Sequence, residues 1–393
     1  MTTRVYLDWN ASAPLRPVAR DAMGAALELC GNPSSVHGEG RAARRLIEQA
    51  REDVATLVGA DPRNVVFTSG GTEANALALS PAIEVGADKA PRDRLLVSTI
   101  EHPSVLAGGR FAPSAVEKLP VTPNGIVDLA ALEQRLAALP EGGSRPLVSI
   151  MAANNETGIV QPVAEASEIV HRYGGLLHVD AVQAAGRMLA NIHELGADLL
   201  TLSAHKLGGA KGAGALIKHD KALHIADPLI RGGGQERGSR AGTENVAAIA
   251  AFGAAAAECR ASLAAETSQM AALRDRLESG IRALTSEATI FGSQAERLPN
   301  TTLLAMPGGK AETLVIGFDL DGVAVSSGSA CSSGKVAPSH VLAAMGVPAE
   351  LARGAIRVSL GAATTETEID RFLNVWQRLT KSLSRGMKPG LAA

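Results

Sequence analysis

The sequence predicts an α/β protein whose main part is a largely parallel sheet covered by helices. Between about residues 65 and 217, short apolar runs alternate with helical patterns, an order typical of parallel strands joined by right-handed crossovers. The chain has 393 residues, more than one small hydrophobic core supports, so a second domain is expected. Polar residues and glycines directly follow several of the apolar runs. In open α/β sheets, ligands bind at this carboxyl edge of the strands.

Four short apolar runs are the expected strands of this sheet. Each is bounded by turn-forming or polar residues, which is the pattern of a buried strand. The runs cover residues 65–69, 95–98, 176–180 and 198–202. After the first run, Gly70-Gly71 turns into an alanine- and leucine-rich stretch that predicts a helix. Loops are expected at 80–93 and 140–146.

A long amphipathic helix is predicted over residues 262–286. Its apolar residues recur at spacings of four, four and three, which places them on one helix face. These residues are Leu273, Leu277, Ile281 and Leu284. The helix is expected to lead into the second domain. The alanine-rich run 246–257 before it is too short to span a bilayer.

A lysine beyond a buried run is the first candidate functional residue. Lys206 ends the sequence Ser203-Ala204-His205-Lys206, which follows the expected strand 198–202. Desolvation and nearby positive charge lower the pKa of a lysine, and only the free amine attacks a carbonyl. Lys206 is therefore a candidate to hold an aldehyde cofactor as a Schiff base. A solvated surface lysine would show the same local pattern.

An acid at the end of the preceding run supports this interpretation. Asp180 precedes Lys206 by 26 residues, which leaves room for one helix and the next strand. If the two strands are parallel neighbours, both residues meet at the same sheet edge. Pyridoxal phosphate needs a carboxylate against its ring nitrogen, because the protonated ring is the electron sink. The alternative for an acid at this position is a helix N-cap.

A phosphate site is expected where the first strand turns into a helix. Gly71 and Thr72 lie at the helix start, where backbone amides and the threonine hydroxyl bind an anion without a lysine. The alternative is an ordinary glycine turn with Thr72 as N-cap. His102 follows the run 95–98 and is a candidate to stack on a ring or exchange protons. A structural histidine is the alternative there.

One cysteine lies in a segment of small residues. Cys331 belongs to the stretch 325–334, which is rich in serine and glycine and favours a mobile loop with an accessible thiol. Cys30 and Cys259 lie in apolar, helical-looking stretches and are expected to be packing residues. The alternative for Cys331 is an incidental loop cysteine.

Together these segments resemble the cysteine desulfurases of the NifS/IscS type, class V aminotransferase relatives that use pyridoxal phosphate to move sulfur from L-cysteine to an enzyme thiol. The number, order and spacing of the motifs carry the resemblance nearly from end to end. The motifs are Tyr6-Leu7-Asp8, Gly31-Asn32-Pro33-Ser34-Ser35-Val36-His37, Thr68-Ser69-Gly70-Gly71-Thr72-Glu73, Glu101-His102, Asn154-Asn155-Glu156-Thr157-Gly158, His178-Val179-Asp180, Ser203-Ala204-His205-Lys206, Gly232-Gly233-Gly234-Gln235-Glu236, Arg240-Ala241-Gly242-Thr243, the stretch 326–331 and Arg357-Val358-Ser359.

The resemblance implies the architecture of pyridoxal-phosphate fold type I. Residues 15–260 would form a large cofactor-binding domain with a mainly parallel seven-stranded sheet covered by helices. Residues 1–14 and 261–393 would form a smaller α+β domain that carries the cysteine loop. The resemblance also implies a homodimer with its sites at the subunit interface.

The resemblance further implies the residues that bind the cofactor. Lys206 would form the Schiff base and carry the substrate α-proton, Asp180 would pair with the ring nitrogen, and Gln183 would bond the phenolic oxygen. His102 would stack on the ring and exchange protons. The other implied cofactor contacts are Gly71, Thr72, Ser203, His205 and Asn155, with Thr243 supplied by the second subunit.

The implied substrate is L-cysteine. Asn155 and Arg357, with Asn32, would bind its carboxylate, because the arginine fork matches a carboxylate. The Cys331 thiolate would attack the substrate sulfur, which leaves a persulfide on Cys331 and releases L-alanine. The persulfide would pass to an acceptor protein such as an iron–sulfur scaffold.

Two other functions remain open. A selenocysteine lyase, or another pyridoxal-phosphate lyase or aminotransferase, would not require Cys331. A catalytically idle docking subunit would bind no cofactor. Composition does not distinguish between these functions. The net charge of −2 disfavours a nucleic-acid partner. The sequence contains no C-x-x-C pair of the kind that would suggest a metal site. Three scattered cysteines and no apolar signal core predict a cytoplasmic protein that does not enter a membrane.

Overall fold

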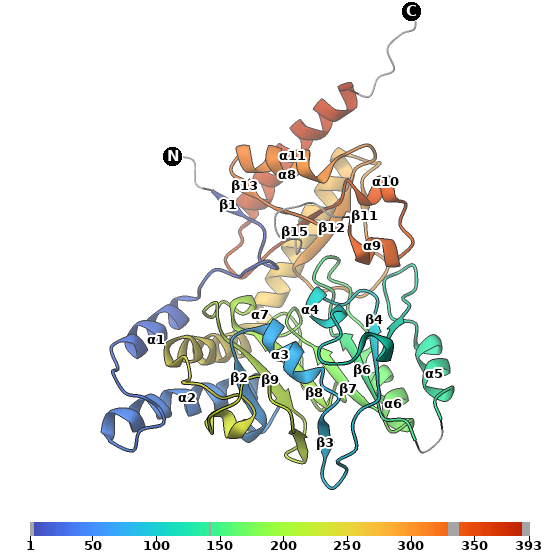
Figure 1. The fold of residues 1–393 in the computed structure, drawn as a ribbon. Helices are drawn as coiled ribbons and strands as arrows, with labels where there is room; N and C mark the ends of the chain where they lie inside the picture. The colour runs from blue at the N-terminus through green and yellow to red at the C-terminus, as the bar shows by residue number, and fades with distance from the viewer. Residues whose placement is uncertain (1–3, 141–142, 329–337, 387–393) are drawn as a thin grey trace, which may run out of the picture.

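The structure is a computed structural model that describes residues 4–140, 143–328 and 338–386. Its larger part contains a seven-stranded sheet with strand order β2-β9-β8-β7-β6-β4-β5 (Figure 1). The strands are β2 (Val65–Thr68), β4 (Arg94–Ser98), β5 (Val116–Leu119), β6 (Pro146–Met151), β7 (Leu176–Asp180), β8 (Leu199–Ser203) and β9 (Gly214–Lys218). Strands β4 to β8 pair in parallel. The predicted α/β fold with a mainly parallel sheet is confirmed.

Strand β9 departs from the parallel pattern. It pairs antiparallel with both of its neighbours, β8 and β2. Only residues 204–213 join β8 to β9, whereas a parallel connection needs a crossover of roughly a dozen residues or more. The short connection therefore turns the chain back and leaves the lysine segment at the edge of the sheet.

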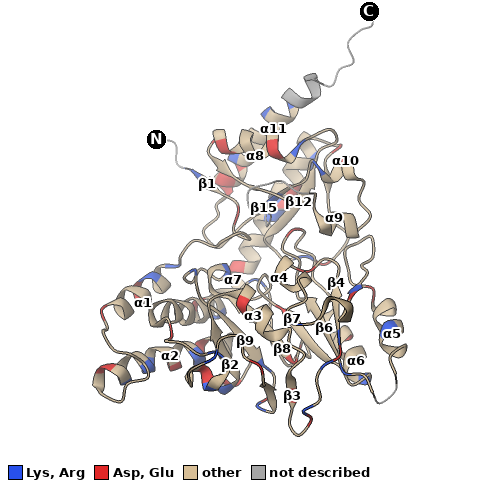
Figure 2. Cartoon of the chain, viewed as in Figure 1, with Lys and Arg blue, Asp and Glu red and all other residues tan. Residues whose placement is uncertain are grey.

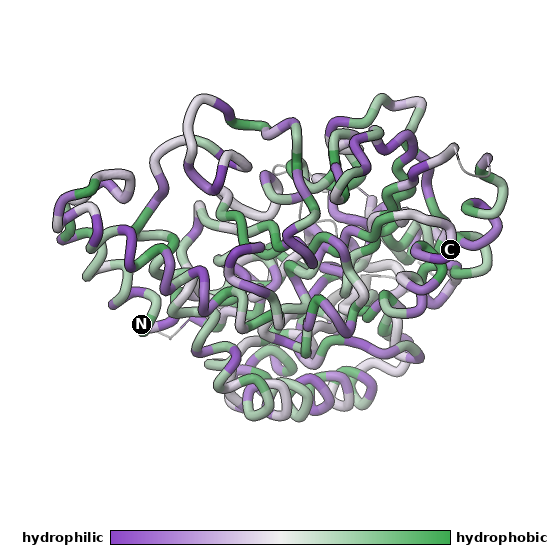
Figure 3. The backbone as a smooth tube through the Cα atoms, turned by 90° about the horizontal axis from the view of Figure 1, so that it is seen from below, coloured by the Kyte–Doolittle hydropathy of each residue, from purple (hydrophilic) through white to green (hydrophobic). Residues whose placement is uncertain are grey.

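Helices cover both faces of this sheet. In β8, Leu200 and Leu202 pack into one core and Leu199 into the other, as expected for a strand whose side chains alternate. The first core is closed by α1 (Pro17–Leu27), α2 (Gly38–Leu57), α5 (Leu129–Ala137), α6 (Val163–Arg172) and α7 (Val246–Leu284). The second is closed by α3 (Gly71–Ala78), α4 (Pro103–Leu106), β3 (Ile83–Val85) and β10 (Leu223–Ile225). Hydrophobic segments accordingly run through the centre of the molecule (Figure 3).

The smaller part is built around a four-stranded sheet with the order β11-β12-β15-β14. Its elements are β11 (Thr289–Ile290), β12 (Thr301–Ala305), β14 (Ser326–Ser327), β15 (Ile356–Ser359), α8 (Ala311–Leu320), α9 (His340–Ala344), α10 (Ala349–Ala352) and α11 (Glu366–Gly386). The N-terminal strand β1 (Val5–Tyr6) pairs in parallel with β13 (Val323–Ala324). Val5 and Leu7 share a core with Leu277 and Trp376, so the first residues join the C-terminal part. The division at residues 14/15 and 260/261 remains a prediction.

Several local expectations need correction. The segment 262–286 is helical to Leu284, as expected, but the helix begins earlier: the apolar run 246–257 belongs to the same continuous helix, α7. The expected loop 80–93 contains the strand β3, which pairs antiparallel with β10. Because β10 lies about 140 residues further along the chain, no local sequence pattern predicts β3. Cys30 follows α1 and is exposed, so it is not a packing residue, whereas Cys259 is buried as expected.

Helix α7 is the one helix of the described residues that is long and apolar enough to cross a membrane by length and composition. More than half of its most apolar stretch is buried inside the structure, where it packs against α1 and α2. A core helix passes the same test of length and composition. Over the rest of the chain, basic and acidic residues are interspersed in both parts (Figure 2).

Candidate active site

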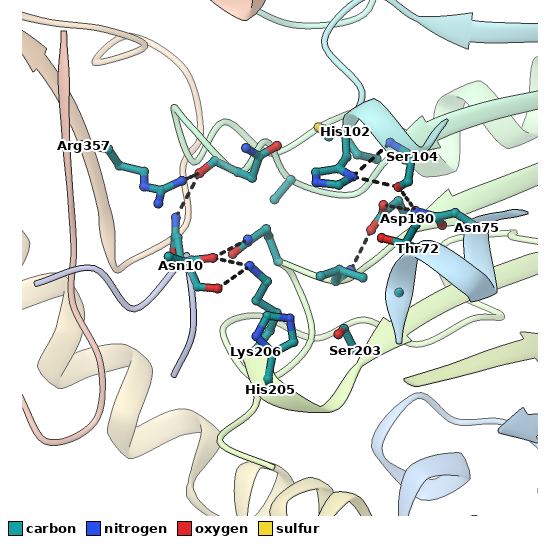
Figure 4. Close-up of a pocket in the computed structure, with 17 residues that line it drawn as sticks. Asn10, Thr72, Asn75, His102, Ser104, Asp180, Ser203, His205, Lys206 and Arg357 are labelled. Atoms are coloured by element: carbon teal, nitrogen blue, oxygen red, sulfur yellow. Dashed lines mark hydrogen bonds between the residues drawn. The ribbon is translucent and has the colours of Figure 1, made fainter. Parts of the chain in front are cut away.

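The carboxyl ends of the parallel strands open into a cavity of about 260 Å³. The loops after β6, β7 and β8 form one side, and the N-terminal arm with β15 forms the other (Figure 4). The lining residues are Asn10, Ala11, Gly71, Thr72, Asn75, His102, Ser104, Met151, Ala153, Asn155, Asp180, Val182, Gln183, Ser203, His205, Lys206 and Arg357. Most of the candidate residues therefore meet at one place.

Lys206 ends a short 3-10 helix, η3 (Ala204–Lys206), that begins directly after β8. Its ammonium group donates hydrogen bonds to the backbone carbonyls of Asn10 and Ala11, the latter at 3.0 Å. The N-terminal arm thus reaches across the cavity and holds the lysine side chain. Lys206 is not a solvated surface lysine.

Asp180 is the last residue of β7, the parallel neighbour of β8. The prediction that Asp180 and Lys206 lie at the carboxyl ends of adjacent parallel strands is confirmed. One carboxylate oxygen of Asp180 accepts from the Asn75 side chain at 2.8 Å, and the other accepts from the Val182 backbone at 3.0 Å. The carboxylate is buried, with 6% of the residue exposed, and its two fixed hydrogen bonds aim it into the cavity.

His102 lies before α4 and caps its first turn. Its Nδ1 accepts from the backbone N–H of Ser104 at 3.2 Å and lies 2.7 Å from the Ser104 hydroxyl. Burial lowers the pKa of His102 below its usual range, and the positive charge of Lys206 lowers it further, while the Asp180 carboxylate acts in the opposite direction. His102 is therefore mainly neutral at pH 7.

The start of α3 and the end of β8 form the end of the cavity at which the phosphate is expected. The N-cap of α3 is Gly70, which offers no side-chain acceptor to the first amides of the helix. Thr72, Ser203 and His205 surround this helix start. Burial, together with the charges of Lys206, Lys211 and Arg187, lowers the pKa of His205 to about 4. The imidazole is thus neutral and suited to share a hydrogen bond with an anion.

Arg357 on β15 forms the opposite end of the cavity. Its guanidinium donates to the backbone carbonyl of Asn155 and to the Asp8 carboxylate, both at 2.8 Å. Arg357 is almost completely buried, with 2% of the residue exposed. A fixed, buried guanidinium of this kind suits a carboxylate ligand.

The remaining predicted residues fall into three groups. Gln183 lines the cavity, and its amide group donates to the Asn10 carbonyl at 3.1 Å. Thr243 is exposed and lines a separate hollow beside Ser69 and Gly212, and Asn32 is exposed on the segment between α1 and α2. Neither Thr243 nor Asn32 lines the cavity of this chain. Cys331 lies outside the residues that the structure describes.

Sequence reasoning missed three polar residues of the lining. Asn75 bonds Asp180, Ser104 bonds His102, and the backbone of Asn10 holds Lys206. Asn75 could have been found from helix spacing. It lies three residues after Thr72 and four after Gly71, which places all three on one face of the same helix. Asn10 could not have been found from its sequence position, because it acts through its backbone.

The cavity fits pyridoxal phosphate by its donor set. It combines a lysine amine, a buried carboxylate at the neighbouring strand end, and an uncapped helix start, which match the aldehyde, the ring nitrogen and the phosphate. Within the part of the chain that the structure describes, Arg357 Nε and Asn75 Oδ1 are buried without a hydrogen-bond partner. Buried polar atoms without a partner in a cavity lining indicate that a polar ligand binds there.

Comparison with known proteins agrees with this assignment. Residues 5–372 match the Aminotransferase class-V family. The chain is 44% identical to a cysteine desulfurase of Cereibacter sphaeroides over 98% of both chains. It is 40% identical to the cysteine desulfurase IscS of Dictyoglomus turgidum, covering 98% of this chain and 96% of that one. The X-ray structure of a NifS-like protein from Rickettsia africae superposes with a TM-score of 0.86 at 36% identity, over 96% of this chain and 99% of that one.

The fold and the cavity define a pyridoxal-phosphate-dependent enzyme of fold type I. The chain belongs to the class V aminotransferase family, and the resemblance to NifS/IscS-type proteins is confirmed.

Proposed function

We propose that the protein is a pyridoxal-phosphate-dependent cysteine desulfurase that converts L-cysteine to L-alanine. The sulfur is transferred to Cys331 as a persulfide and passes to iron–sulfur cluster assembly or another acceptor. The observation that carries this proposal is the convergence of Lys206, Asp180, His102 and Arg357 on one cavity. Relatives over nearly the whole chain that are named cysteine desulfurase support the choice of substrate.

The residues of the cavity divide the work between cofactor and substrate. When bound, pyridoxal phosphate supplies an electron sink that stabilises negative charge on the substrate α-carbon. Asp180 holds the ring nitrogen, and Lys206 is the covalent anchor and the carrier of the α-proton. Thr72, Ser203 and His205, with Gly71 at the helix start, surround the phosphate, and Gln183 and Asn155 contact the cofactor.

Arg357 binds the substrate carboxylate, with Asn155 beside it. The guanidinium is held by Asp8 and by the Asn155 carbonyl, so it does not have to be ordered when the substrate arrives. His102 lies between the Arg357 end and the Asp180 end of the cavity (Figure 4). It is therefore placed to exchange a proton with the substrate. The Cys331 thiolate takes the substrate sulfur.

The proposal includes a homodimer in the cytoplasm. Thr243 faces outward beside the hollow that contains Ser69 and Gly212, and these two residues also line the outer side of the phosphate end. An outward threonine at this position is suited to complete the phosphate site of a second subunit. Asn32 is also exposed, and its contribution to binding of the substrate carboxylate remains a prediction.

The test is to measure both products of the reaction. The purified holoprotein is incubated with L-cysteine and a reductant, and sulfide and alanine are quantified together. We expect equal yields from the wild type and neither product from Cys331→Ser. The matched control is Cys30→Ser, which removes an exposed thiol and should leave both yields unchanged. Full activity of Cys331→Ser would replace the proposal with a thiol-independent lyase.

A further inference from the structure

Four side chains form an unbroken hydrogen-bond chain along the cavity wall. The chain runs from Asp180 through Asn75 and Ser104 to the ring of His102 (Figure 4). The three links measure 2.8, 3.0 and 2.7 Å. It joins the residue expected to hold the cofactor ring nitrogen to the residue expected to exchange protons with the substrate.

The direction of the hydrogen bonds begins at the carboxylate. An ionised carboxylate only accepts, so the Asn75 group 2.8 Å from Asp180 must be the amide NH₂. The second hydrogen of the same NH₂ is donated to the Ser104 hydroxyl oxygen at 3.0 Å. Because that oxygen accepts from Asn75, the Ser104 hydroxyl hydrogen is available to His102 Nδ1 at 2.7 Å.

A second contact at His102 requires the same direction. The backbone N–H of Ser104 also points to Nδ1, at 3.2 Å, and a backbone N–H only donates. His102 Nδ1 therefore accepts from two donors and carries no hydrogen. In a neutral imidazole the proton must then be on Nε2.

We propose that Asn75 and Ser104 are positioning residues that fix His102 in the neutral tautomer with its proton on Nε2. In the proposed reaction, His102 then meets the substrate as an N–H donor and not as a base. This rests on the proposed function only for the identity of the substrate, because the tautomer is a property of the protein itself.

The charged groups around His102 are compatible with a neutral ring. Burial is the main cause that lowers the pKa of His102; Asp180 on β7 acts in the opposite direction, and Lys206 on η3 and His340 on α9 lower the pKa further. The Asn75 amide separates the Asp180 carboxylate from Ser104 and His102 in the chain. The carboxylate is thereby engaged by donors and does not take the His102 proton.

The test is a nitrogen NMR measurement on the holoprotein with ¹⁵N-labelled histidine. The His102 signals are identified by their absence in His102→Gln. We expect an imine-type Nδ1 and a pyrrole-type Nε2 in the wild type at pH 8. In Ser104→Ala the stronger of the two donors to Nδ1 is lost, so the two signals should move toward each other as the tautomers mix. Ser104→Thr keeps the hydroxyl and should restore the wild-type signals.

The same variants have a kinetic readout. We expect Ser104→Ala to lower kcat by about tenfold, a fraction of the usual contribution of a general acid or base, with KM for L-cysteine changed less than about twofold. Ser104→Thr should recover most of kcat. A proton on Nδ1 in the wild type would overturn the proposal, as would signals in Ser104→Ala identical to those of the wild type. Because the NMR result needs no substrate, it stands or falls separately from the desulfurase activity.

Discussion

The two ends of the cavity are held in place by different kinds of contact. Asp180 and Ser203 end neighbouring strands of the seven-stranded sheet, so the sheet ladder itself sets their positions. We call this end the sheet wall; it also includes His205 and Lys206, which directly follow β8, and Gly71 at the start of α3. Its residues are close in sequence to the strands that hold them, and the same ladder that stabilises the fold orients the cofactor contacts.

The opposite wall depends on contacts between distant parts of the chain. Arg357 is held by Asp8, 349 positions away, and by the Asn155 carbonyl. Close by, the Ser339 hydroxyl donates to Glu156 at 2.5 Å, and His340 bonds the Glu101 carbonyl at 3.0 Å. We call this the long-range wall, because residues far apart in the sequence of the same chain hold it together. Changes on the sheet wall should alter cofactor binding, whereas changes on the long-range wall should alter substrate binding and stability.

The largest effect is expected from Lys206→Ala on the sheet wall. It removes the proposed covalent anchor and proton carrier together, so activity should fall by at least about 10³-fold, and the cofactor absorbance should shift. The control is Lys221→Ala, which changes an exposed lysine and should leave both unchanged. Substantial activity in Lys206→Ala would remove this residue from the mechanism.

The second-largest effect is expected from Arg357→Lys, which should weaken substrate binding and leave cofactor binding unchanged. The lysine keeps the charge but loses the fork that binds a carboxylate through two hydrogen bonds. We expect KM for L-cysteine to rise about 30- to 100-fold, the equivalent of one or two charge-assisted hydrogen bonds, with an unchanged cofactor spectrum. Arg353→Lys, at an exposed arginine, is the control. Loss of the cofactor from Arg357→Lys would contradict the division between the two walls.

Glu156→Gln should change how stability depends on pH. Burial raises the pKa of Glu156 to about 7, against the opposing effects of the Ser339 hydroxyl and Arg357. The folded state therefore holds the proton more tightly than the unfolded state, so this stability is present at low pH and is lost as pH rises through 7. We expect the free energy of unfolding of the wild type to fall by about 3 kcal/mol from this group between about pH 4.5 and 8.

The glutamine variant should lose that slope and be more stable than the wild type at pH 8. Denaturant unfolding at several pH values measures the slope. Glu165→Gln changes an exposed carboxylate and should keep the wild-type profile. A full slope in Glu156→Gln would show that another group titrates in this range.

The smallest effect is expected from Gly71→Ala on the sheet wall. A Cβ at this position would lie 3.1 Å from Val182 Cγ2 and 3.4 Å from Ser203 Cβ, so Val182 has to move only by a few tenths of an ångström. We expect cofactor affinity to fall by no more than about threefold, which is less than 1 kcal/mol. Equilibrium titration of the apoprotein with pyridoxal phosphate measures it. A loss of more than tenfold would show that the helix start tolerates no side chain.

Most of the sheet wall could be predicted from the sequence. Asp180 and Ser203 end β7 and β8, and His205 and Lys206 directly follow β8. Because β7 and β8 are parallel neighbours, their carboxyl ends lie together. The glycine turn before α3 likewise predicts, from local sequence alone, the end of the cavity at which the phosphate is expected. The antiparallel strand β9 and the strand β3 inside an expected loop were not predicted, because both are defined by their pairing partners.

The sequence by itself determined the succession of strands and helices, the motif residues at the strand ends and the resemblance to a family. These follow from local patterns, since a strand, a turn or a helix start is set by residues a few positions apart. Only the tertiary structure decided that Asn75 and Ser104 link Asp180 to His102. It alone decided that Asn10 holds Lys206 and that Asp8 holds Arg357. The physical reason is that a hydrogen bond depends on positions in space, and between distant segments these positions exist only once the cores on both sides of the cavity have packed.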